Sequence, residues 1–126
     1  MKKPKIKIIF ENDNEVVIDK PAGIMTHPDG RKDEYTLADW LKDFAKSKFK
    51  KKNWQDVLGG VGDEGREGIV HRLDTGTTGV MIFALNRKAF TFLKNQFQYH
   101  TIKKVYHALV VGHIKNDTGI IDAAIS

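Results

Sequence analysis

The chain has 126 residues, a formal net charge of +5 at pH 7 and no cysteine, and its length suits one domain, or part of one, with a hydrophobic core. The absence of cysteine excludes disulfides, thiolate metal sites and a thiol nucleophile, and no stretch is long and apolar enough to span a membrane, so we expect a cytoplasmic protein. The positive charge favours an anionic partner such as nucleic acid.

Alternating side chains near the N-terminus predict a β-hairpin. Ile6, Ile8 and Phe10 share one face of a half-buried strand, and turn-forming residues follow it. Residues 15–19 predict the second strand, because valine and isoleucine favour extended backbone. The chain then bends at Lys20-Pro21-Ala22-Gly23, since proline lacks a backbone donor and glycine permits unusual backbone angles.

An apolar stripe predicts a helix over residues 36–47. The stripe consists of Leu37, Trp40, Leu41 and Phe44, which have the three- and four-residue spacing of one helix face. Thr36 and Asp39 fit a capping box at the start of the helix. We expect the side chains of the stripe to lie in the core.

A run of lysines with interleaved aromatic residues comes next. It consists of Lys46, Lys48, Lys50, Lys51 and Lys52 with Phe49 and Trp54. Such a run suits contact with a nucleic-acid backbone, and it suits a solvated, mobile linker equally well. The sequence leaves both interpretations open.

Residues 59–68 are rich in glycine and contain a literal match to the dinucleotide-binding fingerprint at Gly60, Gly62 and Gly65. We reject this match, because no apolar strand precedes it and two acidic side chains lie where the pyrophosphate would approach. A flexible approach to the turn that follows is the better interpretation. A nucleotide-dependent oxidoreductase therefore ranks last among the functions considered.

The most informative stretch spans residues 68–79, where Arg72 and Asp74 are followed by small hydroxyl and glycine residues. On an extended segment, two residues two positions apart project to the same side and can face one ligand. A carboxylate beside a guanidinium can supply an anionic nucleophile or base next to a phosphate-binding cation. A surface ion pair that caps a turn is the alternative.

Three further elements are predicted. The apolar residues 80–85 indicate a strand buried on both faces, and residues 88–99 indicate a helix that covers the sheet. Residues 104–111 indicate a last strand with Tyr106 at its centre, either as a stacking platform for a planar ligand or as a core residue. No acidic or histidine residues recur at metal-ligand spacing, so we expect no metal site.

Three ordered blocks of this sequence resemble the RluA-type pseudouridine synthases. They are Asp19 to Gly23, His71 to Asp74 with Thr77-Thr78-Gly79, and Lys104 to Ala108 with Gly112. The resemblance implies an α+β fold with a mixed, largely antiparallel sheet and flanking helices, the catalytic-domain fold of pseudouridine synthases. It also implies that residues 1–126 form the N-terminal portion of that domain, truncated at the C-terminus, with no separate RNA-binding domain.

The resemblance implies isomerisation of specific uridines in structured ribosomal or transfer RNA to pseudouridine, by base flipping and without a metal or organic cofactor. Asp74 would be the catalytic carboxylate, as nucleophile or base; Arg72 would support the vacated base stack and pair with Asp74; and Tyr106 would stack on the flipped uracil. The turn that begins at Lys20 would shape the cleft wall. The partner would be RNA and not a membrane. The alternatives are a non-catalytic RNA-binding module or an inactive fragment of the enzyme.

Overall fold

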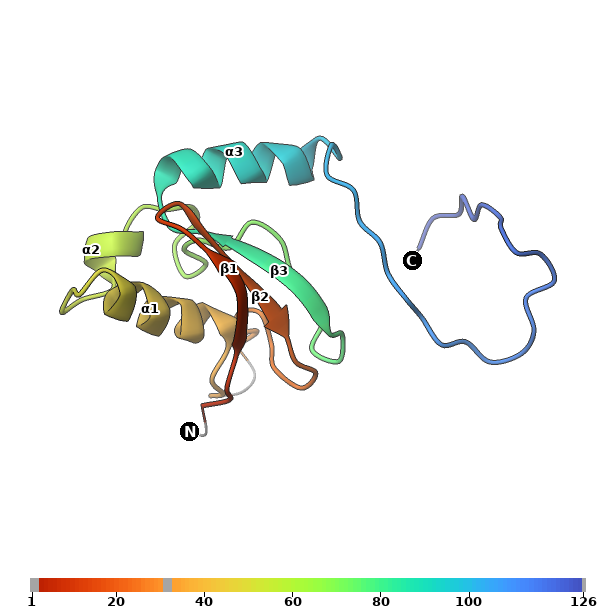
Figure 1. Ribbon diagram of the computed structural model, residues 1–126, viewed down its shortest axis with the longest axis horizontal. Coiled ribbons are helices and arrows are strands. Elements are labelled where there is room, and N and C mark those ends of the chain that lie inside the picture. Colours follow the sequence, from red (N-terminus) through yellow and green to blue (C-terminus); the bar gives the residue numbers. More distant parts are fainter. Residues whose placement is uncertain (1–2, 31–32, 126) are drawn as a thin grey trace.

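The computed structural model describes residues 3–30 and 33–125, and it shows a small sheet between helices (Figure 1). The elements in chain order are β1 (Lys7–Glu11), β2 (Glu15–Lys20), α1 (Leu37–Lys48), α2 (Gln55–Leu58), β3 (Gly79–Ala84) and α3 (Arg87–Gln98). The strand order is β1-β2-β3, and both pairings are antiparallel. In Figure 1, α1 and α2 lie on one side of the sheet and α3 lies on the other. The α+β class is confirmed, and the sheet in the described residues is entirely antiparallel.

The predicted hairpin is present, but β1 does not have the face that the alternation indicates. The register shifts within β1, so that Ile8 pairs with Ile18 and Phe10 pairs with Val17. Because neighbouring residues of β2 point to opposite faces, Ile8 and Phe10 also point to opposite faces. Their exposed fractions are 38% and 52%, since β1 is an edge strand. The bulge therefore overturns the prediction of one shared, half-buried face.

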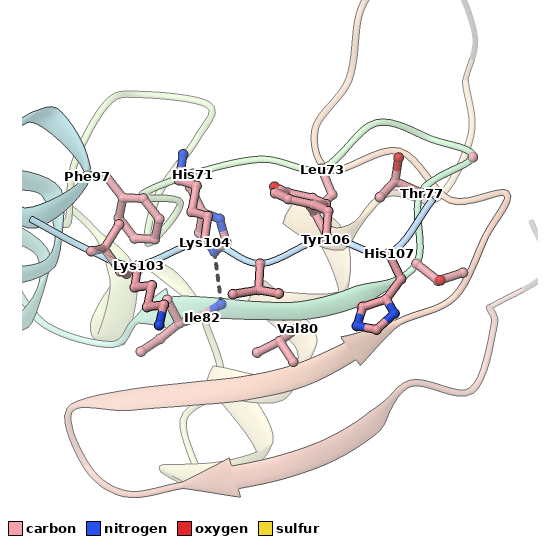
Figure 2. A pocket seen from close by; sticks show the side chains of 15 residues that line it. His71, Leu73, Thr77, Val80, Ile82, Phe97, Lys103, Lys104, Tyr106 and His107 are labelled. Atoms are coloured by element: carbon pink, nitrogen blue, oxygen red, sulfur yellow. Dashed lines mark hydrogen bonds between the residues drawn. The ribbon is translucent and has the colours of Figure 1, made fainter. Parts of the chain in front are cut away.

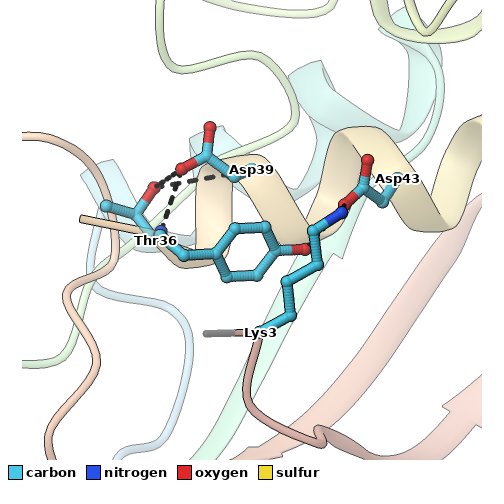
Figure 3. A network of polar contacts seen from close by, with 5 residues as sticks. Lys3, Thr36, Asp39 and Asp43 are labelled. Atoms are coloured by element: carbon cyan, nitrogen blue, oxygen red, sulfur yellow. Dashed lines mark hydrogen bonds and ion pairs between the residues drawn. The ribbon is translucent and has the colours of Figure 1, made fainter. Parts of the chain in front are cut away.

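Helix α1 starts where the sequence predicts. The Thr36 side chain accepts a hydrogen bond from the Asp39 backbone N–H, and the Asp39 carboxylate accepts one from the Thr36 backbone N–H (Figure 3). This capping box satisfies two of the backbone donors that a helix N-terminus leaves without partners. Nearby, the Tyr35 hydroxyl donates to Asp43, which also forms an ion pair with Lys3.

The main core fills the space between α1 and the sheet. Its central side chains are fully buried and come from β2, α1 and β3: Val16, Ile18, Leu37, Leu41, Met81 and Phe83. A second cluster packs α3 against the other face of β3, through Ala84, Ala89 and Leu93. Each buried aliphatic or aromatic side chain contributes about 1.5–3 kcal/mol through the removal of apolar surface from water. Both clusters meet at β3, so this strand is anchored from two sides.

Strand β3 is less buried than predicted. Met81 and Phe83 are fully buried, but 65% of Val80 is exposed and Ile82 is half-buried. The prediction of burial on both faces is wrong for the first half of the strand, because α3 covers only its second half. The uncovered half borders the turn that contains Asp74.

The glycine-rich segment before this turn is folded tightly against the sheet. The backbone N–H of Gly68 donates to the Val61 carbonyl at 2.7 Å, and the Ala84 N–H donates to the Gly68 carbonyl at 2.9 Å. A Cβ atom on Gly68 would lie 2.6 Å from both the Ala84 carbonyl oxygen and a Leu41 methyl group, and the φ of Gly68 is +78°. Glycine is therefore required here by both space and backbone angle. The prediction that this glycine-rich segment is flexible is therefore wrong, because Gly68 packs closely against β3 and α1.

The segment after α3 contradicts the prediction of a last strand. Residues 104–111 contain no strand, and Leu109 and Val111 are fully exposed. Figure 1 shows the chain leaving α3, passing the sheet and then extending away from it. A strand needs a neighbour for its backbone donors and acceptors, and no strand of the described residues pairs with this one. Residues 104–111 therefore remain without a strand partner in the described part of the chain, despite their alternating pattern.

Candidate active site

A buried lysine holds the turn that carries Asp74. Lys20, the last residue of β2, is fully buried, and its ammonium group donates to the carbonyl oxygens of Pro21, Thr75 and Thr77 at 3.0, 3.0 and 2.8 Å. The Gly23 N–H also donates to the Thr75 carbonyl, at 2.8 Å. Three donors on the ammonium and three acceptors match completely. These hydrogen bonds fix the turn to the end of strand β2.

The charge of Lys20 acts on Asp74. Burial lowers the pKa of the Lys20 ammonium, and the nearby Asp74 carboxylate raises it. Two opposite charges stabilise each other when they lie close in a partly desolvated setting. The Asp74 side chain itself is exposed, whereas Leu73 before it is buried. The turn therefore presents a carboxylate to solvent above a buried cation.

Two further contacts fix the start of the turn. The buried Thr26 hydroxyl donates to the Leu73 carbonyl at 3.0 Å. The Nε2 atom of His71 accepts a hydrogen bond from the Ile82 backbone N–H at 3.1 Å, and the His71 ring stacks on Phe97 with 4.3 Å between the ring centroids. Burial, and to a smaller extent the charge of Lys104, lowers the pKa of His71 to about 4. The ring is therefore neutral at pH 7, as an acceptor at Nε2 must be.

Arg72 and Asp74 do not form the ion pair that the turn-capping alternative and the family resemblance both imply. Both side chains are exposed, and within the described residues no ion pair joins them. A guanidinium nitrogen of Arg72 lies 3.4 Å from Nε2 of His27 instead. The backbone explains this, because the Thr77 N–H donates to the Asp74 carbonyl at 3.0 Å and closes a turn there. On a turn, unlike an extended strand, residues two apart need not project to one side.

A groove of about 910 Å³ runs between this turn, the uncovered half of β3 and the segment after α3 (Figure 2). It is lined by His71, Leu73, Gly76, Thr77, Thr78, Gly79, Val80, Ile82, Phe97, Ile102, Lys103, Lys104, Val105, Tyr106 and His107. Figure 2 shows the Tyr106 ring beside Leu73. Asp74 is not a lining residue, but Leu73 before it and Gly76 to Gly79 after it are. The structure thus brings Tyr106 to the turn, while Arg72 lies outside the groove.

Tyr106 is not a core residue, since 62% of it is exposed. An exposed aromatic ring over a groove can stack on a planar ligand, and Lys103 and Lys104 add two cations to the same wall. This arrangement suits a flat, anionic ligand such as a nucleotide. Within residues 3–30 and 33–125, no group of three acidic, histidine or cysteine side chains is placed to hold a metal ion. No helix in this part of the chain is long and apolar enough to cross a membrane.

Sequence reasoning missed three residues that position the site: Lys20, Thr26 and His71. Lys20 and His71 lie inside the recognised blocks, but their types and spacing gave no sign of what they would contact. Lysines are almost never fully buried, so the sequence favours an exposed side chain at Lys20 and gives no signal for its buried role. For Thr26 the sequence likewise carries no signal, since its partner is 47 residues away.

Comparison with known proteins gives consistent results. A family profile described as RNA pseudouridylate synthase matches residues 14–126. The chain is 38% identical over 118 residues to an uncharacterized RNA pseudouridine synthase of Mycobacterium bovis. This aligned region covers 94% of this chain and 35% of that protein. The chain is also 36% identical over 119 residues to the dual-specificity RNA pseudouridine synthase RluA of Vibrio vulnificus. That aligned region covers 94% of this chain and 40% of the relative.

A solved structure agrees with these relatives. The human protein named RNA pseudouridylate synthase domain containing 4 aligns with a TM-score of 0.54 at 26% identity, over 75% of this chain and 30% of that one. The chain thus spans between about a third and two fifths of the length of these two curated relatives.

Proposed function

We propose that this chain, which belongs to the RNA pseudouridylate synthase family, is part of an enzyme that isomerises uridine in RNA. In this proposal it is the part of the enzyme that carries the catalytic aspartate. We further propose that residues 1–126 are the N-terminal portion of the catalytic domain. Ribosomal or transfer RNA as the substrate and a cytoplasmic setting belong to the same proposal. The name of a relative described as a ribosomal large subunit pseudouridine synthase supports the ribosomal substrate, and a relative named as dual-specificity supports more than one RNA substrate.

The observation that carries the proposal is the construction of the Asp74 turn. Its carbonyl groups point inward to Lys20 and Thr26, so the carboxylate is left exposed on a rigid support beside a groove with an exposed tyrosine. A fixed carboxylate is the group that this isomerisation needs, because the bond from N1 to the sugar breaks and a bond from C5 forms. The proton on C5 leaves, and N1 gains one.

Three residues have proposed roles in this reaction. Asp74 acts on the sugar or the base, as nucleophile or as general base. Tyr106 stacks on the uracil that has been flipped out of the RNA, a contact worth on the order of 1–3 kcal/mol. Arg72 supports the stack that the base leaves; its exposed guanidinium lies outside the groove and has only a long contact with His27 to give up.

The test is tritium release from [5-³H]uridine in mixed ribosomal and transfer RNA. Three proteins are compared: this chain, a chimera that adds the C-terminal remainder of a curated relative, and the Asp74→Asn variant of that chimera. We expect release by the chimera and none by its variant. The Asp74 side chain is exposed, so Asp74→Asn should lose only its attraction to Lys20 and stay folded, at a cost of no more than about 1 kcal/mol.

The control is the urea unfolding midpoint of each protein. RNA binding without tritium release by any folded form would contradict the proposal and favour a non-catalytic RNA-binding module. Release by the chimera alone would identify the 126-residue chain as an inactive fragment.

A further inference from the structure

Four exposed lysines lie together in the last turn of α1 and directly after it. This lysine cluster consists of Lys46, Lys50, Lys51 and Lys52. Within the described part of the chain, none of the four has a carboxylate partner, whereas Lys3 and Lys48 pair with Asp43 and Glu11. The cluster is an unneutralised positive surface on a folded helix end and not on a mobile linker.

Lys50 occupies a position that disfavours lysine. It follows the C-cap Phe49 with a φ of +53°, the left-handed conformation that usually requires glycine. The Lys51 N–H donates to the Lys46 carbonyl at 2.9 Å, and the Lys50 N–H donates to the Ser47 carbonyl at 3.2 Å, so the helix ends in a Schellman motif. Glycine would form the same motif without the steric cost of a Cβ atom.

The helix macrodipole does not account for the whole cluster. Cations in the last turn of a helix are stabilised by its negative end, which explains Lys46 and its neighbour Lys48. The effect falls off within that turn, so it does not explain Lys51 and Lys52. Lys46 also lies four residues after Lys42, and two like charges at that spacing destabilise a helix.

We propose that the lysine cluster binds the phosphate backbone of the RNA at a distance from the reacting uridine. This proposal rests on the proposed function, and it adds a second contact region to it. The start of α1 is tied to the Asp74 turn. The Leu37 N–H donates to the Met25 carbonyl, and the hydroxyl of the next residue, Thr26, donates to the Leu73 carbonyl.

The distance fits an RNA longer than the site itself. The 12 residues of α1 place the cluster about 18 Å from the start of the helix. A nucleic-acid duplex carries a charge about every 1.7 Å, so roughly ten phosphates lie within that length. Trp54, the aromatic residue beside the cluster, already has the Lys42 ammonium 4.4 Å from its ring centroid. The ring is also partly buried against the core, so it offers no open platform for a base, and the contact is with phosphates.

The first experiment removes the cluster and compares it with a charge-matched control. The variant is Lys46→Gln, Lys50→Gln, Lys51→Gln and Lys52→Gln in this chain, and the control is Lys5→Gln, Lys7→Gln, Lys88→Gln and Lys94→Gln, which removes four exposed lysines elsewhere. Binding of transfer RNA is measured by fluorescence anisotropy at several salt concentrations. We expect the cluster variant to lose about tenfold or more in affinity and the slope of log K against log salt to fall by about 3. Equal losses in both variants would overturn the proposal, since net charge alone would then explain binding.

The second experiment separates binding from folding. Lys50→Gly relieves the left-handed lysine, so we expect its Tm to rise by about 3–5 °C while the salt slope falls by about 1. A raised Tm with unchanged RNA affinity would contradict the proposal. If the wild-type chain binds RNA and both cluster variants match it, the cluster is not a contact region and the proposed function stands. If the wild-type chain binds no RNA, the cluster proposal fails, and tritium release by the chimera decides the proposed function separately. Tighter binding to vesicles that contain phosphatidylserine than to RNA would assign the cluster to a lipid surface instead.

Discussion

Lys20→Met removes the ammonium group that holds the Asp74 turn and keeps a flexible stem of similar length. Three carbonyl oxygens then lose a charged donor, those of Pro21, Thr75 and Thr77. The Lys20 side chain is fully buried, so the vacated position has little access to water. We expect the turn to loosen while β2 itself is retained, because its ladder does not involve the side chain.

The size of the effect follows from two opposing contributions. Each hydrogen bond to a charged group contributes about 1.5–3 kcal/mol, so three bonds amount to about 5–9 kcal/mol. Against this, the substitution recovers the cost of burying an ammonium group, which is several kcal/mol and also lowers the pKa of Lys20. The net loss in the free energy of unfolding is about 2–4 kcal/mol.

Urea unfolding at pH 7 measures this loss, with Lys5→Met as the control, since Lys5 is exposed. We expect the control to stay within about 0.5 kcal/mol of the wild type. A Lys20→Met protein as stable as the control would refute the reasoning. In the chimera described above, the same variant should lose tritium release at temperatures where it is still folded, because Asp74 is no longer fixed.

Two further predictions concern the other residues of the site. His71 is neutral in the folded protein, with a pKa of about 4 against about 6.5 when unfolded, so the unfolded chain binds an extra proton below pH 6.5. The free energy of unfolding should therefore fall as the pH is lowered from 6.5 to 4, by about 2–3 kcal/mol more than in the His71→Gln variant. Urea midpoints of the two proteins measure this difference, and parallel pH profiles would show the reasoning to be wrong. For Tyr106, if stacking is its role, Tyr106→Phe should keep most tritium release in the chimera. Tyr106→Leu should lose about 5- to 150-fold, which corresponds to about 1–3 kcal/mol. Equal losses would indicate that the hydroxyl acts instead.

Local patterns predicted the elements that carry their own signals. The capping box at Thr36, the apolar stripe of α1 and the apolar run of β3 are each complete within a short stretch, and all three were found within one or two residues of the predicted bounds. The short helix α2 was not predicted, because its four residues are too few to show a periodicity.

Features that depend on distant partners were predicted poorly. The alternation in residues 104–111 indicates a strand, but pairing requires a neighbour that the local sequence cannot specify. The bulge in β1 places Ile8 and Phe10 on opposite faces, and no glycine near it signals this irregularity in the sequence. In the site, the spacing of Arg72 and Asp74 suggested a pair, whereas the backbone turn at Asp74 separates them.

The contact between His71 and Ile82 has a consequence for how the sheet can grow. On the side of β3 away from β2, the Ile82 N–H is taken by a histidine ring and the Ala84 N–H by the Gly68 carbonyl. Free N–H groups on an outer strand invite other chains to pair with them and aggregate. Here the protein's own loop already occupies those donors along the second half of β3. Backbone N–H groups alternate in direction along an antiparallel strand, so Val80, beside the groove, is the remaining residue of β3 whose N–H can receive an incoming strand. The same loop that supports the site therefore also protects the second half of β3 from uncontrolled association.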